Sequence, residues 1–128
     1  MKKILLLIIA AMVIIAVSCK KDEPDPEIIP TSGTLKIEID SKYEYNIYDY
    51  KLDFIKNGVI TQFDSLNGTW DTTYTADIGD TYMVKYRTLK ALDFDYGVGI
   101  RVTYKGIIIN NAYAVNDSIS LSVKGTIY

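Results

Sequence analysis

An alternation of apolar and polar residues with a period of two constrains the fold more than any other feature of this chain. It runs over Leu35–Ile39 and returns over Tyr48–Phe54 and Val98–Tyr104. Successive side chains of a β-strand point to opposite faces of a sheet, so this spacing predicts strands with one buried and one hydrated face. None of these windows shows a 3.6-residue period, although Thr88–Asp95 could hold one helical turn. We therefore expect an all-β domain.

Turn residues separate the alternating segments. Asn57-Gly58 and Lys105-Gly106 are two-residue connections of hairpin length, and Asn-Gly supplies the positive φ angles that a tight hairpin needs. A turn near Ile78–Asp80 predicts a further hairpin between Trp70–Ala76 and Tyr82–Tyr86. Evenly spaced short strands favour a single antiparallel β-sandwich of seven or eight strands with immunoglobulin-like topology, and a small barrel is the alternative.

Three details of the pattern predict local features. The buried parity changes from odd to even residues between Leu35 and Phe54, so we expect a bulge or turn around residues 46–48. The only tryptophan, Trp70, shares its parity with Tyr74 and is predicted to be the central packing residue. Gly97 and Gly99 leave a flat patch on one strand, which indicates a bulge or a close backbone approach.

The first residues of the chain carry a different signal. Two lysines precede 14 consecutive apolar residues, Ile4–Val17. As a helix this run spans about 21 Å, which is short of the roughly 30 Å hydrocarbon core of a bilayer. A positive start, a short apolar stretch and the small residue Ser18 before Cys19 predict a cleavable secretory signal over residues 1–18.

The segment Ala16–Cys19 resembles the lipobox of bacterial lipoproteins, especially those of the Bacteroidota. The resemblance implies that Cys19 becomes an acylated first residue, carrying palmitate-type chains, and that the protein is attached to the outer membrane on its periplasmic or outer face. Two or three acyl chains make such an anchor effectively permanent. The charged and Pro-interrupted residues that follow predict a flexible tether over residues 19–32 and a folded domain over residues 33–128.

Composition excludes several classes of function. The chain contains no His, which removes the usual proton shuttle and the commonest transition-metal ligand. From residue 34 onward 10 basic and 12 acidic side chains are interspersed, so no basic stripe predicts nucleic-acid binding. No serine lies in a nucleophile elbow, and Cys19 is assigned to lipid. We therefore predict no enzyme activity and no cofactor, with a carboxylate-only enzyme as the remaining catalytic alternative.

Two segments are candidate sites. Tyrosines interleaved with acids at Tyr43, Tyr45, Tyr48 and Tyr50 could offer amphipathic contact area to a partner, or could simply be strand residues that pack their rings. The pair Asp93 and Asp95 could donate oxygens to Ca²⁺, but the acids that a calcium loop needs further along are absent, so we expect a solvated loop and no metal site.

The order of parts from residue 34 to 128 is similar to that of the MmpS-type small β-sandwich proteins. The Trp70–Tyr74 strand, the Gly79-Asp80 turn and the late hairpin carry this likeness. Members of that family are accessories of lipid-exporting pumps, so the resemblance implies an accessory subunit of an envelope transporter. We favour a non-catalytic, lipid-anchored module of the cell envelope that contacts a protein or glycan partner, and we keep the transporter accessory as the alternative.

Overall fold

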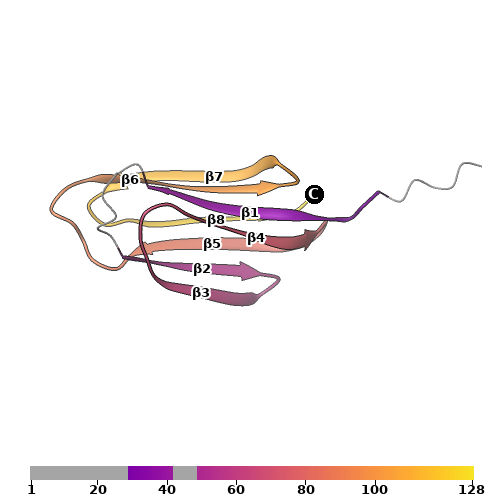
Figure 1. Cartoon of the computed structure of the whole chain (residues 1–128), viewed down its shortest axis with the longest axis horizontal. Helices are drawn as coiled ribbons and strands as arrows, with labels where there is room; N and C mark the ends of the chain where they lie inside the picture. The colour runs from indigo at the N-terminus through magenta and orange to yellow at the C-terminus, as the bar shows by residue number, and fades with distance from the viewer. Residues whose placement is uncertain (1–28, 42–48) are drawn as a thin grey trace, which may run out of the picture.

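The structure is a computed structural model that describes residues 29–41 and 49–128. In these residues it contains eight strands: β1 (Ser32–Ser41), β2 (Tyr50–Lys56), β3 (Val59–Leu66), β4 (Trp70–Asp77), β5 (Thr81–Thr88), β6 (Tyr96–Tyr104), β7 (Ile107–Asn116) and β8 (Ser120–Thr126). They form sheet A, with the order β4-β1-β6-β7, and sheet B, with the order β3-β2-β5-β8 (Figure 1). Every strand pair is antiparallel, so the expected all-β, sandwich-like fold is confirmed. Across the described ranges, no helix has the length and apolar character needed to cross a bilayer.

The core lies between the two sheets and is built by the alternating residues that the sequence indicated. Phe54 of sheet B stacks on Tyr74 of sheet A with ring centroids 4.3 Å apart, so the two sheets are in direct contact. Each large side chain buried in this way stabilises the fold by about 1.5–3 kcal/mol relative to its exposure to water. The aliphatic residues with at most 2% exposure are Leu35, Ile37, Ile39, Leu52, Ala76, Val84, Val98, Ile100, Val102 and Ile127.

Both predicted two-residue hairpins are confirmed. Asn57 and Gly58 have φ angles of 49° and 81°, and Lys105 and Gly106 have φ angles of 48° and 82°. Positive φ at both central residues is the mark of the turn type whose twist matches that of the flanking strands. The first turn joins β2 to β3, and the second joins β6 to β7.

The predicted hairpin between Trp70–Ala76 and Tyr82–Tyr86 is wrong. A tight turn does lie between them, with Gly79 at a φ of 95°, but β4 pairs with β1 in sheet A while β5 pairs with β2 and β8 in sheet B. The connection therefore crosses from one sheet to the other. Turn residues predict that the chain reverses direction. They do not predict whether the next strand pairs with the previous one or enters the other sheet.

Trp70 is also not the centre of the core. It lies on β4, an edge strand of sheet A, and is only partly buried. Its ring packs against Phe63 of β3, the edge strand of sheet B, with centroids 4.7 Å apart. Trp70 thus closes one open side of the sandwich.

The change of buried parity has a structural explanation. Odd residues of β1 and even residues of β2 face the core, as predicted, and these two strands belong to different sheets. The bulge or turn expected around residues 46–48 lies outside the described residues. Within them, the register of β3 shifts opposite Tyr50 and Leu52, and that of β7 shifts opposite Val102 and Thr103.

Thr88 is a buried polar residue at the end of β5, and its hydroxyl group is well satisfied. It donates to the carbonyl oxygen of Ile119 at 3.1 Å and accepts from the backbone N–H of Ile119 at 3.0 Å. A further hydrogen bond joins it to the Tyr96 hydroxyl. One hydroxyl therefore links β5, the start of β6 and the residue that precedes β8.

Replacing Thr88 with Val should destabilise the protein by about 1–3 kcal/mol, because the shape is kept while buried polar partners lose their hydrogen bonds. Urea unfolding would measure the change. The same substitution at Thr73, which is exposed on β4, is the matched control and should change stability little. Equal effects of T88V and T73V would contradict the role given to this hydroxyl.

Candidate functional site

The predicted tyrosine site is only partly within the described residues. Tyr43, Tyr45 and Tyr48 lie outside them, as do Cys19 and the predicted signal sequence. Tyr50 is 2% exposed, its ring lies 4.7 Å from that of Tyr86, and its hydroxyl donates to the Gly68 carbonyl at 3.2 Å. Tyr50 is therefore a core residue with no ring face for a partner, because the first residue of β2 has the inward parity of that strand.

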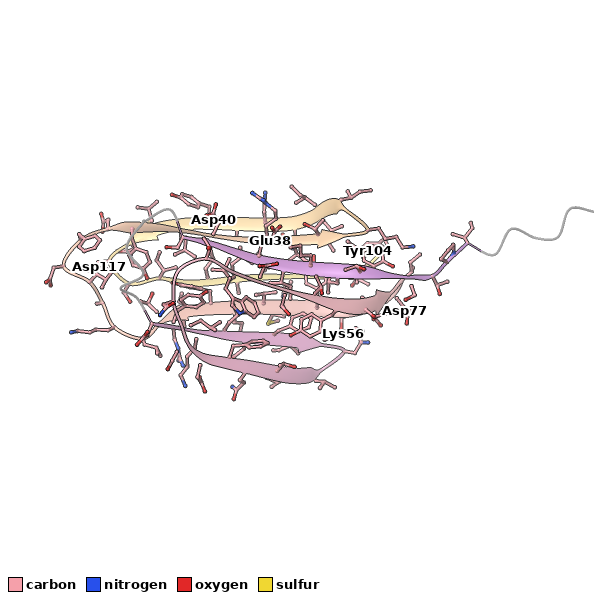
Figure 2. The ribbon with its side chains drawn as sticks, in the orientation of Figure 1. Glu38, Asp40, Lys56, Asp77, Tyr104 and Asp117 are labelled. Carbon is pink, nitrogen blue, oxygen red and sulfur yellow. The ribbon has the colours of Figure 1, made fainter. Side chains whose placement is uncertain are left out.

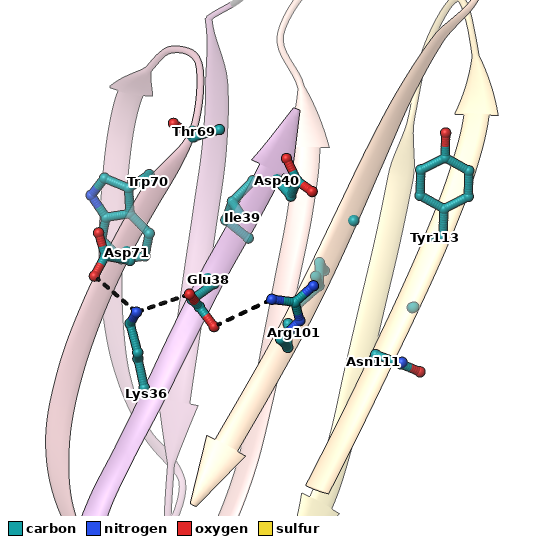
Figure 3. A pocket seen from close by; sticks show the side chains of 13 residues that line it. Lys36, Glu38, Ile39, Asp40, Thr69, Trp70, Asp71, Arg101, Asn111 and Tyr113 are labelled. Carbon is teal, nitrogen blue, oxygen red and sulfur yellow. Dashed lines mark hydrogen bonds and ion pairs between the residues drawn. The ribbon is translucent and has the colours of Figure 1, made fainter. Parts of the chain in front are cut away.

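The outer face of sheet A carries a groove with a volume of about 530 Å³ (Figure 3). It crosses β4, β1, β6 and β7, so it collects side chains that are far apart in the sequence. The even residues of β1 point outward here, because the odd residues face the core. The side chains that give the groove its chemical character are Lys36, Glu38, Asp40, Asp71, Arg101, Asn111 and Tyr113.

Four charges form a ladder across three strands in this groove. Glu38 lies directly opposite Asp71 on one side and Arg101 on the other. Two opposed carboxylates would repel, but the Lys36 ammonium lies 2.8 Å from Glu38 and 3.7 Å from Asp71 (Figure 3). The hydrogen bond to Glu38 raises the pKa of Lys36 above its ordinary value. Arg101 is 3.9 Å from Glu38, so this contact is an ion pair at long range and leaves N–H donors directed to the groove.

The other half of the groove combines an aromatic ring on β7 with glycines of β6 that have no side chain. Gly99 of β6 lies opposite Tyr113 of β7, whose side chain is 53% exposed. A Cβ atom at Gly97 would lie 2.1 Å from the Tyr113 hydroxyl oxygen, so this position must stay without a side chain for the ring to lie where it does. The structure therefore shows a close approach at Gly97, made by a tyrosine side chain and not by the backbone, and it shows no bulge at the two glycines. A Cβ atom at Gly99 would meet Tyr113 and Asp40 only at ordinary contact distances of 3.7 and 3.9 Å, and Gly99 lines the groove between them.

The remaining acidic candidates stand apart from this groove. Asp93 and Asp95 are exposed in the connection between β5 and β6. Among the described residues, no three His, Cys, Asp or Glu side chains are grouped so that they could hold a metal ion.

The groove was not foreseen from the sequence. Its local signals were the outward parity of Lys36, Glu38 and Asp40 and the missing side chains at Gly97 and Gly99. These segments are some 60 residues apart, and only the pairing of β1 with β6 brings them together. No protein-family model matches the chain, and no curated protein matches its sequence.

The burial of Tyr50 predicts a loss of stability at alkaline pH. Burial raises the pKa of Tyr50 to about 12, from an ordinary value of 10.0. The unfolded chain therefore releases this proton above about pH 10 while the folded protein keeps it, so the free energy of unfolding should fall as pH rises through this window.

Urea unfolding across this pH range would measure the effect. Tyr50→Phe keeps the ring and removes the proton, so it should reduce the pH dependence without abolishing it, because burial also raises the pKa of Tyr86. Tyr128→Phe is the control, because Tyr128 is 93% exposed. An unchanged alkaline slope in Y50F would contradict this assignment.

Proposed function

We propose that this protein is a non-catalytic, lipid-anchored binding module of the cell envelope, and that the groove on sheet A binds a glycan. A half-exposed tyrosine ring beside a dense set of hydrogen-bonding side chains on an open sheet face is the observation that carries the proposal. Small-molecule sites combine apolar contact area with a few well-placed polar groups that fix orientation. A sugar ring matches this combination, with one C–H face and a rim of hydroxyl groups.

The polar groups of the groove suit hydroxyl groups better than they suit a polyanion. Glu38, Asp40 and Asp71 supply acceptors, while Arg101 and Asn111 supply donors. Three carboxylates against the two cations Lys36 and Arg101 would repel a strongly anionic chain, such as a nucleic acid. The opening spans four strands, which allows room for more than one sugar unit.

The rest of the proposal follows from the sequence. A signal sequence over residues 1–18 and an acylated Cys19 would place the protein at the outer membrane, and a tether over residues 19–32 would join the anchor to the domain. The two four-stranded sheets support an immunoglobulin-like sandwich for residues 33–128, because the chain crosses between the sheets five times from β1 to β8.

Tyr113→Ala should weaken glycan binding several-fold, because an aromatic contact of this kind is worth about 1 kcal/mol. The measurement is a screen of the protein against neutral and acidic oligosaccharides, followed by titration calorimetry with the oligosaccharides that bind. Arg101→Gln should also lower affinity, and Thr103→Ala, on the same strand but outside the groove, is the matched control. Failure of all oligosaccharides to bind, or equal affinity for Y113A and T103A, would refute the glycan assignment.

Acylation is tested separately by mass spectrometry of the protein from membranes. We expect loss of residues 1–18 and the added mass of two or three acyl chains on Cys19. Cys19→Ala should remove the added mass and release the protein from the membrane fraction. A free thiol, or a leader that is still attached, would show that the anchor is absent.

A further inference from the structure

Exposed apolar side chains gather at one end of the molecule. This end holds the start of β1, the β2–β3, β4–β5 and β6–β7 turns and the C-terminus, and we call it the tether end (Figure 1). Figure 2 shows Asp77 toward this end and Asp117 at the opposite one. Of the twelve large apolar side chains that are exposed in the described ranges, eight lie at the tether end: Ile29, Val59, Ile60, Ile78, Ile107, Ile108, Ile109 and Tyr128.

Hydrogen bonds between turns hold the tether end together. The backbone N–H of Ile78 donates to Thr31 at 2.9 Å, and that of Gly79 donates to Ile127 at 2.8 Å. The Lys105 ammonium donates to the Pro30 carbonyl at 2.7 Å. The segment that enters β1 is thus fixed to the β4–β5 and β6–β7 turns, so the apolar tips keep their places relative to it.

Lys56 and Asp80 form an ion pair at this end, and Asp77 is exposed. Asp80 accepts hydrogen bonds from the Asn57 amide at 2.7 Å and the Asp77 backbone N–H at 3.0 Å, and it forms an ion pair with Lys56 at 3.0 Å. These contacts hold the pKa of Asp80 down at about 2. A carboxylate satisfied in this way does not oppose the approach of an apolar phase as strongly as a free one would.

The tip of the β6–β7 hairpin is the most apolar part of the tether end. Ile107, Ile108 and Ile109 are 70%, 54% and 37% exposed, although an alternating strand would bury at least one of three successive residues. The register shift in β7 falls at Ile109, which is the residue left without a partner on β6. β7 is also an edge strand, and an exposed apolar edge is a liability unless something covers it.

We propose that the tether end docks onto the lipid leaflet, with the Val59-Ile60 and Ile107-Ile108 tips inserted at the boundary between headgroups and acyl chains. This inference rests on the proposed acylation of Cys19. Ile29 follows Cys19 by ten positions, so a tether extended at about 3.1 Å per residue reaches about 31 Å. The anchor therefore holds the domain near the bilayer by the same end that carries the apolar tips.

A second copy of the chain and a protein partner are the other possible occupants of this surface. The attachment of the tether favours lipid, because it brings this end to the leaflet in every copy before any partner is met. Insertion of aliphatic side chains is driven by burial of apolar area, so docking should depend only weakly on salt.

The test uses the acylated full-length protein in vesicles of phosphatidylethanolamine and phosphatidylglycerol. Cys19 is the only cysteine, and acylation blocks its sulfur, so Ile108→Cys provides the single thiol for an environment-sensitive fluorophore. We expect blue-shifted emission and quenching by lipids that carry a nitroxide on the acyl chain. Ser118→Cys, in the β7–β8 connection at the opposite end, is the matched control and should report water.

A second variant tests the surface without relying on one label. Val59→Asp and Ile60→Asp, added to the labelled I108C protein, should reduce both the blue shift and the quenching. Val115→Asp, on β7 with the label but away from the tip, should reduce neither. These positions are exposed, so the fold should tolerate the changes. Co-flotation with vesicles reports whether the protein is anchored, and the emission reports whether the tips touch lipid. Failure of the proposed acylation and failure of the docking proposal can therefore be told apart.

Three outcomes would overturn the docking proposal. If the protein floats with the vesicles but the fluorophores of I108C and S118C both emit as in water, the domain is anchored and does not touch lipid. A blue shift that grows with protein concentration in detergent-free solution without vesicles would assign the tips to a second copy. A shift that needs an added envelope protein, and not lipid, would assign them to that partner.

Discussion

The contact between the inner faces of sheets A and B is the constraint on which the rest of the structure depends. Side chains from both sheets fill one core, and the stacked rings of Phe54 and Tyr74 join the sheets directly. Since β1, β2, β5 and β6 give alternate positions to this core, their other positions are left to meet water or a ligand. The charged ladder, the glycines of β6 and the exposed ring of Tyr113 all occupy such outward positions.

Much of the fold could be predicted from the sequence because its signals are local. The alternation in β1 and β6 and the turn at Asn57-Gly58 each depend on a few neighbouring residues, and the structure confirms them. The crossing from β4 to β5 could not be predicted in the same way, because a tight turn has the same residues whether it joins partners in one sheet or strands of two sheets. The prediction for Trp70 was wrong for a related reason. Its parity indicated that it faces the inside of the sandwich, but the alternation does not show that β4 is an edge strand.

The candidate site was less predictable than the fold, and the reason is physical. A tyrosine-rich segment stands out in a sequence, but Tyr50 is buried in the core because it is the first residue of β2 and faces inward. The groove gains its character from pairs such as Glu38 with Arg101 and Gly99 with Tyr113. Of these, the first joins residues more than 60 positions apart, and strand pairing over such a separation leaves no mark in either segment alone.

The length of β7 has a consequence for how a docked domain meets its surroundings. Tyr113 lies six residues along this strand from Ile107, a rise of about 20 Å at about 3.3 Å per residue. In the docked arrangement that we propose, the sandwich stands on its hairpin tips, and the groove of sheet A faces sideways at a set height above the lipid. For the glycan that we propose as its ligand, this geometry would favour polymers that lie along the cell surface over chains that approach end-on from the medium.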